Sequence, residues 1–326
     1  MERVLVTGAT GFIGCEISRQ LSAKGLRPRL LVRRPLRAPL LASLDAELIQ
    51  GDLQSGASLE RAVRNIDTIF HLGARATFES YSALRPTIVD GSLSLMKAAC
   101  TAGVKKFVYS SSLLVYDNQA EPIDRNTPAV PRIAYGRAKL EAEKRLADLA
   151  RQGGICFAAI RIPHTYGAKD LLFERIRTGR VIAPGLGKNR VAHIHIEDVA
   201  RVMIAAAEHG WSGVLPISDF LPTSWNEFFG EVKKYYPGFR LFRVPSWLAY
   251  PTAWCIDLLH VSRSRPNLHT PDAVRGWNLN LSVKPDILWN ELGLEPKFPS
   301  VYEGIPAVLD DCIAFRWVHS IADRSS

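Results

Sequence analysis

The glycine-rich turn near the start of the chain constrains the fold more than any other feature. Residues 7–14 read TGATGFIG, with glycines at Gly8, Gly11 and Gly14. The turn directly follows an apolar run at 4–6 and opens a stretch with helical spacing that continues to Lys24. In such a unit the first glycine allows the tight turn, the second lets the backbone approach a pyrophosphate, and the third lets the helix pack closely. Because free N–H groups at a helix N-terminus favour anions, the turn predicts a dinucleotide-binding unit.

The rest of the first half alternates strand-like and helical patterns. Short apolar runs at 30–32, 67–71, 106–110 and 157–161 are separated by helical patterns at about 56–65, 81–102 and 135–152. Apolar strands alternating with helices are typical of a parallel sheet that helices cover on both faces. We therefore predict an α/β, doubly wound Rossmann fold over residues 1–167, with residues 191–216 returning to it.

The pattern becomes irregular after about residue 165. All seven tryptophans lie beyond residue 210, and the segment 244–261 carries a single charge, Asp257. We predict a smaller C-terminal substrate lobe made of residues 168–190 and 217–326. Its aromatic content favours a hydrophobic substrate, although the same residues could simply form the core of the lobe. A third alternative places 244–261 on a membrane surface as an amphipathic helix, but Pro251 argues against one continuous helix there.

The charge of the chain indicates an anionic small molecule rather than a nucleic acid. The net charge is +9, and the densest basic cluster is Arg27, Arg29, Arg33, Arg34 and Arg37. Nucleic-acid surfaces usually interleave basic and aromatic residues. The sequence has no Phe, Tyr or Trp from residue 13 to residue 69, so we expect no nucleic-acid partner.

The cysteines and the N-terminus indicate a cytoplasmic protein. The five cysteines are scattered, without a CxxC pair or metal-ligand spacing, which predicts free thiols in a reducing compartment and no metal site. The N-terminus lacks the pattern of a signal peptide. No apolar run reaches the roughly 18 residues that a membrane-spanning helix needs.

The end of the second strand indicates which dinucleotide binds. This strand ends in Arg33 and Arg34, and no acidic residue lies between Arg27 and Leu44. A carboxylate at this position would accept from the ribose 2′-OH of NAD, whereas arginine suits a 2′-phosphate. We predict NADP rather than NAD, with a solvated basic loop as the alternative. Asp52 follows the third strand and is predicted to accept from the adenine amino group, unless it is an ordinary turn residue.

A tyrosine and a lysine in one helical pattern indicate acid–base chemistry. Tyr135 and Lys139 stand at positions i and i+4, on one face of the predicted helix. An ammonium group near a phenol favours the phenolate and lowers the pKa of the tyrosine. Tyr135 would then be a usable general acid or base.

The chain resembles the extended short-chain dehydrogenase/reductase family over nearly its whole length, because it has a series of motifs in the order and spacing of that family. The motifs are TGATGFIG at 7–14, GDL at 51–53, HLGA at 71–74, YSSSLLVY at 109–116, YGRAK at 135–139, RIPHTYG at 161–167 and HIEDVA at 195–200. The C-terminal lobe looks most similar to the 3β-hydroxysteroid dehydrogenase and dihydroflavonol-reductase-like branch. Members of that branch act on hydrophobic alcohols and ketones.

The resemblance implies roles for individual residues. It implies Ser112 as the hydroxyl that polarises the substrate oxygen, with Ser111 as the fallback. It implies Tyr135 as the proton donor or acceptor, and Lys139 as a ligand of the nicotinamide ribose that also lowers the Tyr135 pKa. The predicted cofactor-binding residues are Gly8, Thr10, Gly11, Phe12, Ile13, Gly14, Arg33, Arg34, Asp52, Leu53, Leu72, Gly73, Ala74, Tyr135, Lys139 and Pro163.

The sequence departs from the family pattern at two places, and the family suggests an oligomeric state. The family's Tyr-Gly-Pro is Tyr166-Gly167-Ala168 here, which is expected to alter only the loop. An Asn that often precedes a Val-x-Gly-Thr run is missing, since residues 88–92 read IVDGS, so any role of that Asn is in doubt. Many relatives dimerise through two helices from each chain, which correspond here to 81–102 and 135–152. The first helix carries Leu84, Ile88, Leu95 and Ala99 at helical spacing, whereas the second carries Leu140, Leu146 and Leu149 among many charges. The resemblance implies a possible homodimer through these helices.

Three functions fit these motifs: an oxidoreductase, a nucleotide-sugar epimerase and a non-catalytic NADP-binding sensor or scaffold. A dehydratase fits less well. Dehydratases of the family place Asp-Glu after the catalytic hydroxyl residue, where this chain has Leu113 and Leu114. Epimerases often have Asn at the position of His164, but a basic set could still clamp a sugar-nucleotide diphosphate: Arg175, Arg177, Arg180, Lys188 and Arg190. A non-catalytic NADP-binding sensor or scaffold typically lacks the Tyr or the Lys, and both are present. We predict an NADP-dependent oxidoreductase acting on a hydrophobic carbonyl or alcohol, with a nucleotide-sugar epimerase as runner-up.

His193 and His195, on one side of a predicted strand, are interpreted as ordinary histidines rather than metal ligands.

Overall fold

The computed structural model of the chain describes residues 2–35, 41–259, 269–285 and 287–314. Arg37 of the basic cluster and residues 260–261 of the apolar segment lie outside the described residues.

The centre of the molecule is a seven-stranded parallel sheet with the strand order β11-β6-β5-β4-β1-β2-β3. The strands are β1 (Val4–Thr7), β2 (Arg29–Val32), β3 (Glu47–Gln50), β4 (Thr68–His71), β5 (Lys106–Ser112), β6 (Cys156–Ile162) and β11 (Gly213–Pro216). The chain runs from β1 outward to β3 and then returns to the other side of β1 with β4. The strand order therefore reverses between β1 and β4, where open α/β sheets bind their ligands.

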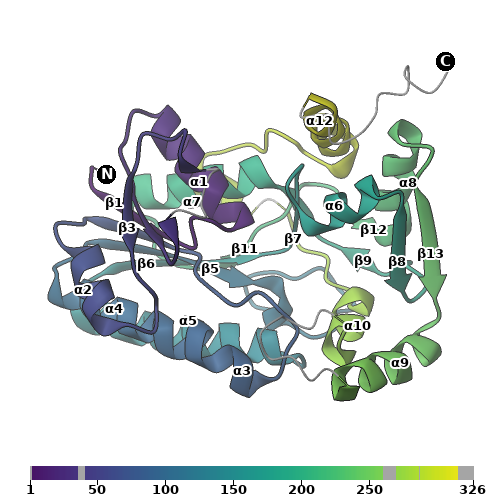
Figure 1. Ribbon diagram of the computed structural model, residues 1–326, viewed down its shortest axis with the longest axis horizontal. Coiled ribbons are helices and arrows are strands. Elements are labelled where there is room, and N and C mark those ends of the chain that lie inside the picture. Colours follow the sequence, from purple (N-terminus) through teal and green to yellow (C-terminus); the bar gives the residue numbers. More distant parts are fainter. Residues whose placement is uncertain (1, 36–40, 260–268, 286, 315–326) are drawn as a thin grey trace.

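Helices cover both faces of the sheet (Figure 1), which confirms the predicted doubly wound fold. One face carries α1 (Phe12–Ala23) and α7 (Ile196–Glu208), and the other carries α2 (Gly56–Val63), α4 (Gly91–Thr101) and α5 (Ala134–Gly153). The expected helix over 81–102 is divided into α3 (Tyr81–Arg85), a π turn (Pro86–Asp90) and α4. Pro86 has no N–H to continue the regular ladder, which accounts for the wider turn at this point.

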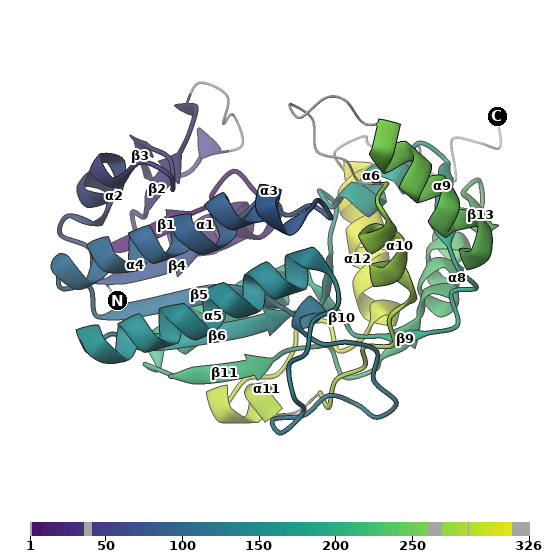
Figure 2. The same ribbon diagram turned by 90° about the horizontal axis from the view of Figure 1, so that it is seen from below.

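The C-terminal lobe consists of short strands and helices at one end of the sheet (Figures 1 and 2). Its strands form three two-stranded sheets, which pair β7 (His164–Tyr166) with β10 (His193–His195), β8 (Arg180–Pro184) with β13 (Arg240–Val244) and β9 (Arg190–Val191) with β12 (Thr223–Ser224). Its helices are α6 (Leu171–Arg177), α8 (Trp225–Tyr235), α9 (Ser246–Leu259), α10 (Pro271–Asn278) and α12 (Val301–Ala314). Aromatic side chains of α8, including Phe228 and Phe229, are buried in the lobe's own core.

One late helix packs on the sheet rather than on the lobe. The side chains of Leu288, Trp289 and Leu292 in α11 (Ile287–Leu292) are buried in the same core cluster as β1 and α7. The Trp289 indole also donates to the carbonyl oxygen of Ser218 at 2.8 Å. The chain therefore returns to the sheet domain a second time within the stretch that the sequence assigned to the lobe.

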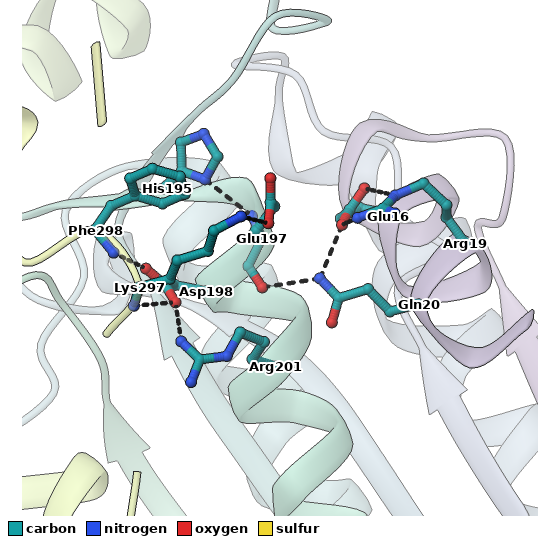
Figure 3. Close-up of polar contacts among 9 residues, drawn as sticks. All are labelled: Glu16, Arg19, Gln20, His195, Glu197, Asp198, Arg201, Lys297 and Phe298. Atoms are coloured by element: carbon teal, nitrogen blue, oxygen red, sulfur yellow. Dashed lines mark hydrogen bonds and ion pairs between the residues drawn. The ribbon is translucent and has the colours of Figure 1, made fainter. Parts of the chain in front are cut away.

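The buried carboxylate of Asp198 bonds the segment before α12 to the sheet domain (Figure 3). Asp198 is fully buried in the first turn of α7, and its oxygens accept from the backbone N–H of Lys297 at 2.8 Å and of Phe298 at 2.9 Å. Arg201 donates to the same carboxylate at 2.6 Å. The acidic residue of the HIEDVA motif thus has a structural role, because it satisfies two backbone donors of a segment far away in the sequence.

The prediction about Pro251 was wrong. The segment forms one helix, α9, with Pro251 inside it. Proline removes a hydrogen bond to the carbonyl group of Trp247, but Trp247 is 77% exposed, so water can replace the missing donor. The Thr252 hydroxyl, one position on, donates to the Leu248 carbonyl oxygen at 2.8 Å.

Candidate functional site

The glycine turn leaves no room for side chains. Gly8 has φ +70°, and a Cβ atom there would lie 2.7 Å from the backbone nitrogen of Gly73. A Cβ atom at Gly14 would lie 2.2 Å from the carbonyl oxygen of Gly8. The Gly11 N–H donates to that same oxygen at 2.8 Å. The first and third glycines are therefore required by the backbone itself, as the spacing predicted.

A cavity of about 770 Å³ opens beside this turn, at the point where the strand order reverses. Its wall brings together the glycine turn, the ends of β2 and β4, and the first turns of α5. The predicted residues that line it are Gly8, Thr10, Gly11, Phe12, Ile13, Gly14, Arg33, Asp52, Leu53, Leu72, Gly73, Ala74, Tyr135 and Lys139. The volume lies in the range typical of sites for cofactors and small molecules. The cavity wall also contains Arg75, Thr77 and Ser110, which no sequence motif had marked as site residues.

A second cavity of about 510 Å³ is lined by Thr10, Arg33, Arg34 and Asp52. The first cavity has three of these residues in its wall as well, so the two spaces adjoin. One carboxylate oxygen of Asp52 accepts from the Gln54 N–H at 3.0 Å. Asp52 therefore shapes the turn after β3 and lines both cavities.

The basic cluster divides into two groups with different surroundings. Arg27 lies 3.3 Å from Asp45, and Arg29 lies 3.0 Å from Glu47. Arg33 and Arg34 are exposed at the rim of the cavities. Two of the arginines thus have carboxylate partners within the fold, whereas the other two face a space that suits an anion.

Tyr135 and Lys139 both face the larger cavity, one turn apart on α5. The Lys139 ammonium donates to the carbonyl oxygen of Ser110 at 2.7 Å and lies 5.8 Å from the centre of the Tyr135 ring. Burial lowers the pKa of Lys139 to about 7.

The predicted direction of the Tyr135 pKa was wrong for this structure. Burial raises the pKa of Tyr135, and no opposing effect of Lys139 is large enough to lower it. The reason is that Lys139 is itself buried, so the charge that would stabilise the phenolate is disfavoured as well. At neutral pH the phenol therefore keeps its proton.

The three serines at the end of β5 have different partners. Ser110 lines the cavity, and the Ser111 hydroxyl donates to Glu143 at 2.6 Å. The Ser112 hydroxyl oxygen accepts from the Leu114 N–H at 3.2 Å, which leaves its own proton free to donate. Ser112 pairs in register with Ile162, the residue before Pro163. Neither Ser112 nor Pro163 is among the residues that line the two cavities.

A buried ion pair behind these serines was missed by the sequence analysis. Arg161 donates to both oxygens of Glu143, at 2.6 and 3.1 Å, and to the Tyr116 hydroxyl at 2.5 Å. Glu143 is 3% exposed. It stands one helical turn after Lys139, on the buried face of α5, and this spacing was the signal that could have revealed it. The pair joins α5 to β5 and β6 behind the catalytic candidates.

His71 connects the glycine turn to α4 beneath the cavity wall. Its ring nitrogens lie 2.7 Å from the Thr7 hydroxyl and 2.7 Å from the Ser92 hydroxyl. Ser92 gives its proton to the Ile88 carbonyl oxygen, so Nε2 of His71 must donate to Ser92, and Nδ1 accepts from Thr7. The Thr7 oxygen in turn accepts from the Gly73 N–H at 3.2 Å. Burial lowers the pKa of His71 to about 3, which keeps this neutral tautomer. Ser92 thus bonds within the run that lacks the family's usual Asn.

Three further histidines, His164, His193 and His195, lie on the paired strands β7 and β10. His164 and His193 are joined through their Nδ1 atoms at 2.9 Å and pack against Trp225 and Phe228. His195 accepts from the Glu197 N–H at 3.3 Å and so caps α7. Within the described ranges, no group of three or more His, Cys, Asp or Glu is placed to hold a metal ion.

The apolar residues behind the dimer prediction lie inside the chain. Leu84, Ile88, Leu95 and Ala99 are at most 1% exposed and belong to the core beneath the sheet. They are therefore not available to an interface, and dimerisation through these helices stays a prediction.

Comparison with known proteins gives the same picture as the fold. Residues 4–217 match the NAD dependent epimerase/dehydratase family. The chain is 29% identical over 220 residues to a ceramide reductase of Caulobacter vibrioides, covering 66% of this chain and 64% of the relative. It is also 29% identical over 225 residues to a 3-beta-hydroxysteroid dehydrogenase of Mycolicibacterium neoaurum, covering 64% and 61%. The chain covers less than two thirds of the length of each of these relatives.

Among solved structures, MoeE5 in complex with UDP-glucose and NAD has the same fold. It superposes with a TM-score of 0.79 at 23% identity, over 96% of this chain and 99% of that one.

Proposed function

The chain belongs to the NAD-dependent epimerase/dehydratase family, and from this premise we propose that it is an NADP-dependent oxidoreductase. It transfers a hydride between the nicotinamide and the carbonyl or alcohol carbon of a hydrophobic small molecule. The observation that carries the proposal is the shared cavity, whose wall contains both the glycine turn and the pair of Tyr135 and Lys139. The turn would hold a dinucleotide in the same cavity that the acid–base residues line.

The residues of the cavities fit an NADP molecule. The turn at Gly8, Gly11 and Gly14 would hold the pyrophosphate, because a Cβ atom at the first and third positions would collide with the backbone. Arg33 and Arg34 would hold the 2′-phosphate, since both line the smaller cavity and neither forms an ion pair with a described carboxylate. Lys139 and Pro163 would lie at the nicotinamide end.

The chemistry requires a proton and a polarised carbonyl. When bound, the reduced dinucleotide supplies the hydride. Ser112 donates a hydrogen bond to the carbonyl oxygen, because its own proton is free. Tyr135 gives its proton to that oxygen as the alcohol forms, and its raised pKa keeps the proton available at neutral pH. Lys139, held by the Ser110 carbonyl oxygen, would supply N–H groups for the ribose.

The alternatives receive less support from the residues. The basic set proposed to clamp a diphosphate lies outside the walls of both cavities, and four of its five members are exposed. The Asp-Glu of dehydratases is replaced by Leu113 and Leu114. A non-catalytic sensor or scaffold would need no acid–base pair in the cavity. An epimerase and a sensor are therefore the competing outcomes of the first experiment.

Oxidation of NADPH, followed by its absorbance, tests the function directly. We expect turnover with a panel of hydrophobic ketones that includes a steroid ketone and a long-chain 3-oxo lipid. The purified chain should leave UDP-glucose and UDP-galactose unchanged when it is incubated with them and NAD. Interconversion of the two sugars would identify the epimerase. Tight NADPH binding without turnover of any ketone would favour the sensor.

Cofactor preference is expected to depend on Arg33. A charge-assisted contact to the 2′-phosphate contributes about 1.5–3 kcal/mol, which is about ten- to a hundredfold in affinity. Arg33→Asp removes this contact, repels the phosphate and offers an acceptor to the 2′-OH of NAD, so the preference should shift toward NAD. Calorimetric titration with both cofactors measures this. Added salt should weaken the preference of the wild type, because an exposed phosphate site is screened.

Arg27→Asp is the matched control. Arg27 belongs to the same basic cluster but lies beside Asp45 and outside both cavity walls, so its replacement should leave the preference unchanged. Equal affinity of the wild type for NAD and NADP at low salt would show that the cofactor assignment is incorrect.

A further inference from the structure

Helix α9 turns its largest apolar side chains to solvent. Trp247 is 77% exposed and Trp254 60%, whereas the buried residues of the helix are the small Ala249 and Ala253. The other exposed apolar residues of α9 are Leu248, Ile256, Leu258 and Leu259. A surface helix normally buries its large apolar residues and exposes polar ones. The reverse arrangement in α9 marks an apolar surface that the described residues do not cover.

Helix α9 packs against the rest of the lobe through its small residues. Ala249 and Ala253 pack with Val274 of α10 in one buried cluster. Helix α10 is itself fixed, because Asp272 accepts from the backbone N–H of Ala134 at 2.7 Å. Ala134 directly precedes Tyr135, so the support of the apolar surface is bonded to the start of the helix that carries the acid–base pair.

The neighbouring strands add apolar and basic side chains. Strand β13 leads through Pro245 into α9, and both lie at the same end of the molecule (Figures 1 and 2). Ile182 of β8 and Phe242 of β13 pair in register and are 65% and 49% exposed. Arg180 and Arg240 form the next pair on the same face. Both are exposed, and neither forms an ion pair with a carboxylate among the described residues.

We propose that α9, together with the exposed face of β8 and β13, docks on the surface of an anionic phospholipid bilayer. Tryptophan and leucine on a helix beside arginine are typical of a segment that lies in the lipid interface, where the apolar groups enter the acyl region and the cations meet phosphate. The net charge of +9 also favours binding to an anionic surface.

A second copy of the chain is a less suitable occupant. A two-fold contact places the same surface of each copy against the other. The patch that carries Arg180 and Arg240 would then be placed against a copy of itself, and β8 and β13 carry no carboxylates for these arginines to pair with. A bilayer with anionic headgroups presents the opposite charge.

The contact lies along the bilayer surface rather than across it. None of the helices in the described part of the chain is both long enough and apolar enough to span a bilayer. Under the proposed function, on which this point alone rests, hydrophobic substrates dissolve in the same membrane that α9 contacts.

Co-sedimentation with lipid vesicles tests the docking surface and needs no turnover. The full chain should bind vesicles of phosphatidylcholine with added phosphatidylglycerol, and bind pure phosphatidylcholine more weakly. The double variant Trp247→Ser/Trp254→Ser should lose at least about tenfold in binding, because two large apolar groups no longer enter the lipid. Arg180→Glu/Arg240→Glu should abolish the preference for anionic vesicles. Val130→Ser, at a residue that is 61% exposed elsewhere on the molecule, is the matched control and should bind as the wild type does.

Two further measurements keep the outcome independent of folding and of catalysis. Calorimetric NADPH binding without lipid should be the same in all three variants and the wild type, which shows that the variants fold. Brominated phospholipid should quench tryptophan fluorescence of the wild type, and less so in the double tryptophan variant. The proposal is overturned by absence of binding to anionic vesicles at low salt, or by binding that the tryptophan replacements leave intact. A dimer in sedimentation that the tryptophan variant converts to monomer would also overturn it, since a second copy would then cover α9.

Discussion

Tyr135→Phe is expected to lower the turnover of hydrophobic ketones by about 10²–10⁴-fold, while NADPH affinity stays largely unchanged. The substitution removes one hydroxyl group and keeps the ring that lines the cavity. The loss should therefore fall on the proton-transfer step rather than on cofactor binding. Steady-state NADPH oxidation and calorimetric titration measure the two quantities separately.

Tyr81→Phe is the matched control for this change. Tyr81 stands on α3, outside the cavity wall, and its hydroxyl donates to Glu141 on the surface of α5. The same chemical change at this position should leave turnover near the wild-type value. Near-normal turnover of Tyr135→Phe would remove Tyr135 from the mechanism.

The stability of the fold is expected to fall steeply between pH 6.5 and 4.5. Burial lowers the pKa of His71 and His164 to about 3 and of His195 to about 4, and lowers the pKa of His193 as well. As the pH falls below 6.5, these histidines take up protons in the unfolded state but not in the folded one. Folded pKa values below the unfolded ones thus contribute stability at neutral pH that is lost as the pH falls.

Two buried carboxyl groups act in the opposite direction. Burial raises the pKa of Asp170 to about 7 and raises that of Asp219 well above its ordinary value. In the same pH window these groups hold protons in the folded state and not in the unfolded state. The four histidines outnumber these two carboxyl groups, so the unfolded state takes up more protons than the folded one across the window, and the stability falls as the pH falls.

Two variants that should change the pH dependence of stability in opposite directions test this balance. His71→Asn removes a group that only the unfolded state protonates, so it should flatten the dependence by about 1.4 kcal/mol per pH unit. Asp170→Asn removes a group that only the folded state protonates, and should steepen the dependence by the same amount. Urea unfolding at a series of pH values gives the slopes, which are independent of any constant loss of stability. Slopes that match the wild type in both variants would contradict the assignment of these buried groups.

The sheet domain could be predicted from the sequence because its signals are local. Glycines at the spacing of residues 8, 11 and 14, between an apolar run and a helical pattern, predict a strand–turn–helix, and in the structure a Cβ atom at Gly8 or Gly14 would collide with the backbone. The alternation of apolar runs and helices then implies a parallel sheet. Tyr135 and Lys139 were predicted to share a face because one helical turn separates them, and both do line one cavity.

Other properties depend on which distant residues meet. Arg29 and Arg33 look alike in the sequence, but the neighbouring strand gives Arg29 a partner in Glu47, whereas Arg33 lies at the cavity rim. The position of His71 between Thr7 and Ser92 joins three separate segments, and no spacing along the chain reveals it. The pKa of Tyr135 was predicted in the wrong direction because burial, which depends on the whole fold, outweighs the nearby lysine.

The sequence by itself therefore determined the parallel sheet, the dinucleotide turn and the candidate acid–base pair. These follow from backbone sterics and helical periodicity, which act over a few residues. Only the tertiary structure decided which arginines face the cavity, which hydroxyl at the end of β5 keeps a free proton, and which face of α9 meets solvent. Burial and electrostatic pairing depend on elements far apart in the chain, so Trp247 and Trp254 are exposed while Trp289 is fully buried.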